Sequence, residues 1–134
     1  MPVSLAEGTI VRTPEFLVKN IEYHIDIRVN RGLPFGQLSC MIGGNRHPSH
    51  CAMFHWDNVI DTEWKVMDGD QVVAQGVAKG SDGDMAWSDS FMDRYLGEFV
   101  GKANKKYVVE VKFTKDGTAL NKLNPRLIVR MIDF

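Results

Sequence analysis

Hydrophobic and polar residues alternate without interruption along residues 21–29. The odd positions are apolar, whereas the even positions between them are Glu22, His24, Asp26 and Arg28. Successive side chains of a β-strand point to opposite faces of a sheet, so this run predicts a half-buried strand. The same pattern returns along residues 107–113, where one face carries Tyr107, Val109, Val111 and Phe113.

An Asp-Gly pair at positions 68 and 69 separates two runs rich in β-forming residues, 62–67 and 71–74. Asp-Gly between two such runs is a strong signal for a hairpin. Further strands are expected at residues 15–19, 86–91, 95–100 and 126–132. Together these runs predict an all-β fold, an antiparallel β-sandwich of about 7–8 strands.

One segment departs from this pattern. Residues 35–44 contain few β-branched side chains and end in Gly43 and Gly44, which predicts one short helix near residues 35–42 with a glycine C-cap. Two long loops are expected, at 45–58 and at 76–93. Because binding residues concentrate in loops that a rigid scaffold holds, these two loops are the first places to look for function.

The length and net charge of the chain exclude some classes of protein and favour others. The chain has 134 residues, the size of one domain, so a single domain spanning 1–134 is expected. Its net charge is −1, which lacks the basic surplus of a nucleic-acid-binding protein. No apolar run reaches membrane-spanning length. Residues 1–8 do not resemble a signal peptide, so the protein is either intracellular or has lost its signal.

The chain has two cysteines, Cys40 and Cys51. A disulfide between them would close a short loop, stabilise the fold by roughly 3 kcal/mol, and place the protein in the periplasm or cell envelope. The alternatives are a pair of reactive thiols, two metal ligands, or two unrelated free thiols. Free thiols would instead favour the cytoplasm.

Three histidines, His47, His50 and His55, lie close to Cys51 in the first expected loop. Imidazole nitrogens and a thiolate suit Zn²⁺ or copper, so a metal-binding loop is one hypothesis. The spacing matches no standard zinc motif, and a bridged Cys51 could not serve as a thiolate ligand. Solvated loop histidines are therefore the favoured interpretation, and no metal or other cofactor is expected.

Motifs of catalysis are missing from the sequence. It contains no G-x-S-x-G elbow and no phosphate-binding glycine loop. Residues 80–84 alternate oxygen-bearing side chains but lack the spacing of a calcium-binding loop. We therefore expect a protein that is not an enzyme.

Aromatic residues in the two expected loops are the strongest remaining lead. Phe54 and Trp56 fall in the first loop, and Trp87 and Phe91 in the second. Exposed loop aromatics can serve as protein-binding hot spots or as platforms on which sugars stack. Alternatively, one or two of them fold back to close the ends of the sandwich. Trp64, in a predicted strand, is expected in the core.

The order of these elements resembles a bacterial cell-envelope β-sandwich domain family of unknown function. The resembling positions are Phe16-x-Val18, Tyr23-x-Ile25-x-Ile27, Ile42-Gly43-Gly44, Thr62-x-Trp64-x-Val66 and Tyr107-x-Val109-x-Val111. The resemblance implies the sandwich fold and an envelope location, and it supplies no active site. The cysteine pair and the histidine-rich loop depart from that family. Small bacterial domains of this kind are sometimes encoded beside secreted toxins that they neutralise.

These observations favour a non-catalytic protein-binding module, most concretely a bacterial immunity protein that neutralises a cognate secreted toxin. The expected interface residues are Phe54, Trp56, Trp87 and Phe91. A carbohydrate-binding module that uses the loop tryptophans is the first alternative. A metal-binding protein that uses His47, His50 and His55 is the second.

Overall fold

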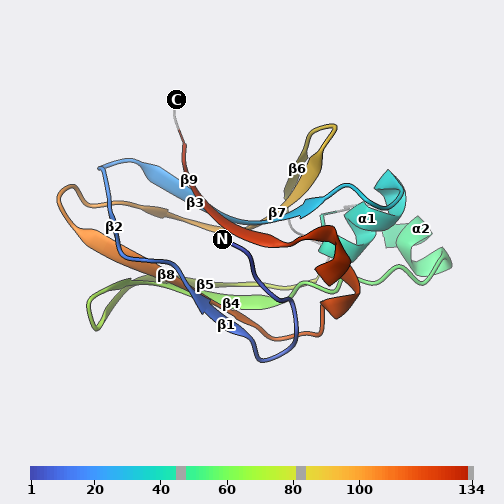
Figure 1. The fold of residues 1–134 in the computed structure, drawn as a ribbon, viewed down its shortest axis with the longest axis horizontal. Coiled ribbons are helices and arrows are strands. Elements are labelled where there is room, and N and C mark those ends of the chain that lie inside the picture. Colours follow the sequence, from blue (N-terminus) through green and yellow to red (C-terminus); the bar gives the residue numbers. More distant parts are fainter. Residues whose placement is uncertain (45–47, 81–83, 133–134) are drawn as a thin grey trace.

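The chain folds into two antiparallel β-sheets packed face to face, as the computed structural model shows for residues 1–44, 48–80 and 84–132 (Figure 1). The predicted antiparallel β-sandwich is therefore confirmed. One sheet has the strand order β1 (Ile10–Arg12), β8 (Lys106–Phe113), β4 (Thr62–Asp68), β5 (Gln71–Ala78), with β2 (Phe16–Leu17) also paired to β8. The other has the order β6 (Met85–Trp87), β7 (Phe91–Val100), β3 (Glu22–Asn30), β9 (Arg126–Met131).

Strand periodicity and the core agree closely. The odd residues of β3 face inward and are buried, namely Tyr23, Ile25, Ile27 and Val29. The inward residues of β8 meet them from the other sheet, and all belong to one hydrophobic cluster. The predicted hairpin joins β4 to β5, but its turn lies at Gly69 and Asp70, because Asp68 still pairs with Gln71 as the last residue of β4. Within the described residues there is one strand that the sequence did not indicate, β1, because only three residues are too few for alternation to show.

Trp64 belongs to the core, as predicted, and packs beside a bulge in β7. Ile25 pairs with Gly97 and Asp26 with Tyr95, which leaves Leu96 as the extra residue of the bulge. The indole N–H of Trp64 donates a hydrogen bond to the Leu96 carbonyl (3.1 Å). The ring lies against two glycines, Gly76 and Gly97, at positions where a Cβ would overlap its atoms.

Helix α1 (Phe35–Ile42) is present as predicted and ends at Gly43, whose φ of 80° is left-handed. The interpretation of residues 45–58 as an irregular loop was wrong for part of that segment. It contains a second helix, α2 (Pro48–Met53), which packs beside α1 at one end of the sandwich (Figure 1). Proline is favoured at the start of a helix, but six residues are too few to give a periodic signal. A 3₁₀ helix, η1 (Thr118–Leu123), follows β8.

The interpretation of residues 76–93 as a second long loop was also wrong for half of that segment, and residues 81–83 within it lie outside the described residues. β5 continues to Ala78, β6 occupies Met85–Trp87, and β7 already begins at Phe91. Gly76 interrupts the β-forming pattern of β5, and the charged residues Asp93 and Arg94 conceal the start of β7. No helix in the described part of the chain is both long and apolar enough to cross a membrane.

Candidate functional site

A disulfide joins α1 to α2. Cys40 and Cys51 are bonded, with their Cα atoms 5.7 Å apart, so the predicted bridge is confirmed. Both residues are buried. Nε2 of His50 lies 3.5 Å from Sγ of Cys40. Because both sulfur atoms are oxidised, neither is available to bind a metal as a thiolate.

Several large apolar side chains gather around the pair of helices. Phe54 stacks on Trp56, with ring centroids 4.7 Å apart, and Phe35 meets Trp87 edge-on at 5.4 Å. A Cβ at Gly36 would lie 4.0 Å from the Trp56 ring, and Phe35 is the residue before Gly36, so both pairs lie beside the first turn of α1. We call this the aromatic surface, made by Phe35, Met53, Phe54, Trp56 and Trp87. Trp87 is 56% exposed, Phe54 55% and Met53 71%.

Three of the four predicted interface aromatics lie in this surface, and Phe91 lies apart from it. Phe91 begins β7 and faces outward from the four-stranded sheet. The Arg28 guanidinium covers its ring at 3.7 Å. Phe35 and Met53 were missed. Phe35 is the first residue of α1 and Met53 the last of α2, and a position at the end of a short helix carries no sequence signal of exposure.

The predicted histidine group does not come together in the described residues. His47 lies outside them. His50 sits on α2 beside the disulfide, whereas His55 follows the helix, is exposed and has a φ of 57°.

A second candidate is the outer face of the four-stranded sheet, which is unusually polar. Three cross-strand rows run over it, defined by the pairing of β3 with β7 and β9. The rows are Glu98–His24–Arg130, Tyr95–Asp26–Ile128 and Asp93–Arg28–Arg126. A cleft of about 360 Å³ opens over them, and Asp84, Met85 and Ala86 of the β6 segment form one of its walls. We call it the polar cleft.

Asp26 lies at the bottom of the polar cleft and is only 1% exposed. Nε of Arg130 donates to its Oδ2 at 2.6 Å, whereas Oδ1 is buried and has no hydrogen-bond partner among the described residues. Burial raises the pKa of Asp26 above its ordinary value, although the hydrogen bond and charge of Arg130 act in the opposite direction. A buried acceptor without a partner costs roughly 1–3 kcal/mol, which marks this atom as unusual.

The neighbours of Asp26 are held firmly. Arg28 donates two hydrogen bonds to the Asp93 carboxylate, at 2.8 and 3.0 Å. Burial, together with the charge and hydrogen bond of Glu98, raises the pKa of Tyr95 to about 12, so its hydroxyl stays protonated at neutral pH.

Two clusters of described residues have the donor atoms of a metal site. One is Cys40, His50 and Cys51, which the disulfide removes from consideration. The other is Glu22, His24 and Glu98, whose donor atoms lie within 4.8 Å of one another. Sequence reasoning placed Glu22 and His24 on one strand face but assigned them no role. Glu98 could not be added, because nothing in the sequence says that β7 pairs with β3.

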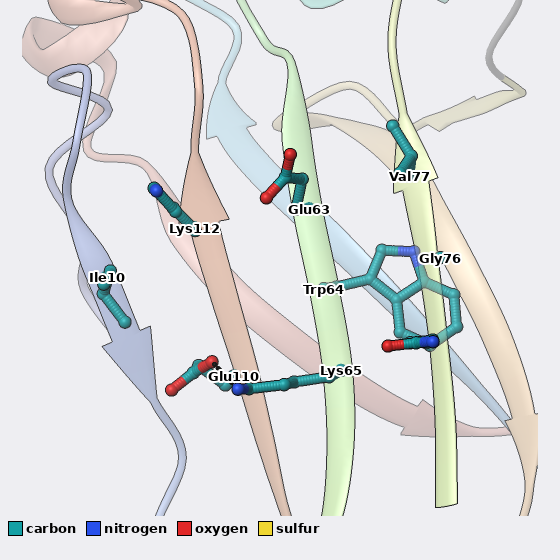
Figure 2. Close-up of a pocket in the computed structure, with 9 residues that line it drawn as sticks. Ile10, Glu63, Trp64, Lys65, Gly76, Val77, Glu110 and Lys112 are labelled. Atoms are coloured by element: carbon teal, nitrogen blue, oxygen red, sulfur yellow. Dashed lines mark ion pairs between the residues drawn. The ribbon is translucent and has the colours of Figure 1, made fainter. Parts of the chain in front are cut away.

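A groove of about 510 Å³ crosses the outer face of the five-stranded sheet (Figure 2). Two of its charged residues, Lys65 and Glu110, are already paired, since Glu110 binds both Arg12 (2.6 Å) and Lys65 (3.2 Å). Figure 2 shows the Trp64 ring beside Gly76, and Trp64 is only 8% exposed. The groove therefore offers no exposed aromatic face for a sugar.

Comparison with known proteins supports the fold and no more. No protein-family model matches the chain, and no match was found among curated proteins. A solved structure, the crystal structure of GEBA250068378 from Sulfurospirillum deleyianum, superposes with a TM-score of 0.67 at 8% identity. The similarity covers 100% of this chain and 96% of that one.

Proposed function

We propose that this protein is a non-catalytic binding module that recognises another protein through the aromatic surface. The observation that carries the proposal is the exposure of Trp87 at the end of β6 and of Met53 and Phe54 at the end of α2, the helix that the disulfide joins to α1. Aromatic residues and methionine are enriched in protein interfaces. Rigid presentation lowers the entropic cost of association.

The composition of the surface favours a protein over a sugar as the partner. Sugars stack on a flat, exposed aromatic face. Here Phe54 stacks on Trp56, and Trp87 is met by the edge of Phe35, so each tryptophan already has an aromatic neighbour. Met53 extends the surface with a flexible apolar side chain, which suits a protein partner.

In its most specific form, the proposal is an immunity protein that neutralises a secreted toxin. The disulfide supports an oxidising compartment such as the periplasm or cell envelope, where such a protein would act. The candidate partner is then the protein encoded beside it.

The test is the affinity between the purified chain and the product of the adjacent gene. We expect Trp87→Ala and Phe54→Ala each to weaken binding at least about tenfold, as interface hot spots do. Ile10→Ala is the matched control, because Ile10 is as exposed as Trp87, at 56%, but lies on the five-stranded sheet. Unchanged affinity in both aromatic variants would exclude this surface as the interface. A glycan array tests the sugar alternative directly.

A further inference from the structure

Strand geometry brings three metal-ligating side chains together on the outer face of the four-stranded sheet. Glu22 and His24 are two residues apart on β3, so they share one face. Glu98 of β7 is the direct cross-strand partner of His24. All three positions are fixed by backbone pairing, so the cluster does not depend on a loop.

The distances within the cluster suit a shared ion. Nε2 of His24 lies 3.3 Å from Oε2 of Glu22 and 3.5 Å from Oε2 of Glu98. Donor atoms of a tetrahedral zinc site, each about 2.0–2.2 Å from the metal, lie about 3.3–3.6 Å apart. A proton on Nε2 can point to only one of the two carboxylates. Nε2 is buried and makes no hydrogen bond with any residue that the structure describes.

Charge also favours a cation. In residues 1–44, 48–80 and 84–132, His24 is the one basic group that pairs with Glu22 or Glu98. Arg130 is the cross-strand neighbour of His24 on β9, but its Nε forms an ion pair with Oδ2 of Asp26 at 2.6 Å. A divalent cation would balance the two glutamates.

A second, independent observation comes from Asp26. It lines the polar cleft together with His24 and Glu98, is 1% exposed, and keeps Oδ1 without a hydrogen-bond partner among the described residues. Two buried polar atoms of one strand face, His24 Nε2 and Asp26 Oδ1, therefore lack partners beside the same cleft. Water or another ligand on a bound metal would give Asp26 a donor.

The His24 ring is held in place from its other side. Tyr95 packs edge-on against it, with ring centroids 4.9 Å apart and an angle of 64° between the planes. A ligand whose orientation is fixed before the metal arrives binds with less loss of entropy.

We infer that Glu22, His24 and Glu98 bind one divalent transition-metal ion, with an open coordination position toward the polar cleft. One imidazole and two carboxylates match Zn²⁺, whereas Ca²⁺ takes six to eight oxygen ligands. Three protein ligands leave the fourth zinc position to water or to a small molecule in the cleft.

The test is titration of tag-free, chelator-dialysed protein with ZnCl₂ by calorimetry, alongside the visible absorption of the Co²⁺-loaded protein. We expect one ion per chain. Glu98→Gln should weaken Zn²⁺ binding at least about tenfold and diminish the Co²⁺ absorption. Glu98 is 55% exposed, so this variant is expected to fold. His24→Ala should do the same, with far-UV circular dichroism as the folding check.

His55→Ala is the control, because it removes an exposed histidine at the other candidate location. It should leave the stoichiometry and affinity unchanged. The inference is overturned if the wild-type protein binds no Zn²⁺. It is equally overturned if Glu98→Gln binds like wild type, or if binding is lost in His55→Ala instead.

Discussion

Gly76 and Gly97 lie in the middle of strands, and nothing in the sequence indicates why glycine stands at these positions. Glycine weakens a strand unless something needs the space of its missing side chain. Here the Trp64 indole occupies that space, and its N–H bonds to the bulge carbonyl of Leu96. The two glycines, the bulge and the tryptophan thus form one interdependent unit.

Gly97→Ala is expected to destabilise the protein by about 1–3 kcal/mol, because the added methyl group overlaps the Trp64 ring in a closely packed core. The measurement is urea unfolding at equilibrium. Gly36→Ala is the matched control. A Cβ there meets only ordinary contacts at 3.9 and 4.0 Å in the first turn of α1, so stability should be unchanged or slightly raised. Equal losses in the two variants would contradict this account of Trp64.

For Asp26, the sequence predicted the sheet face on which the residue lies but not its burial. Alternation correctly placed it on the polar face of β3, and polar faces are normally solvated. The groups that bury it come from residues 84–86, 95 and 130, none of which is near it in sequence. A strand pattern indicates the face of a residue but not what covers that face. The metal-ligand cluster was missed for the same reason.

Among the elements, α2 depends most on its surroundings. Its six residues are too few to form a stable helix alone, since isolated helices below about 12 residues are marginal. The Cys40–Cys51 disulfide fastens it to α1, and Phe54 and Trp56 directly follow it. The order of half the aromatic surface therefore rests on one covalent bond.

Replacing both cysteines by serine should lower the free energy of unfolding by about 2–4 kcal/mol. Amide hydrogen exchange should show faster exchange in α2 than elsewhere, because local opening no longer requires global unfolding. Reduction of the wild-type protein should have the same effect. If exchange rises evenly over both sheets, the disulfide does not act locally as described.

Long alternating strands were predictable here, whereas short or interrupted elements were not. β3, β8 and the β4–β5 hairpin carry their own periodicity and turn signals. β1 and α2 have three and six residues, and their stability comes from neighbours outside their own segments. β6 was indicated only as part of a longer run at 86–91, which the structure divides between β6 and the start of β7. The two expected loops were therefore too long, although the first does lead into the aromatic surface.

At the scale of the whole molecule, lowering the pH is expected to reduce the stability of the fold through one carboxyl group, Glu110. Burial tends to raise the pKa of Glu110, but hydrogen bonds and charges from Arg12 and Lys65 outweigh it and hold that pKa below its ordinary value of 4.5. A carboxyl group with a lowered pKa in the folded state stabilises the fold fully above its unfolded pKa. That stability is lost as the pH falls through the folded value.

Glu110→Gln should therefore cost about 0.5–1 kcal/mol at pH 7, a modest figure because Arg12 is 70% exposed. The difference from wild type should vanish as the pH falls below about 4.5. Unfolding in urea at a series of pH values measures it. Glu63→Gln, on the same sheet face, controls for the loss of one carboxylate. A difference that persists at low pH would refute the role assigned to Glu110.

The pairing of β3 has a consequence for how the chain is made. β3 ends at Asn30, but its partners β7 and β9 begin only at Phe91 and Arg126. At roughly 5–20 residues per second, a ribosome takes on the order of 5–20 seconds to reach β9 after finishing β3. Until β7 has been made, the apolar face of β3 has no strand of its own sheet to pair with. The yield of folded protein in a cell should therefore depend on how well the nascent chain is shielded, more than on the stability of the finished sandwich.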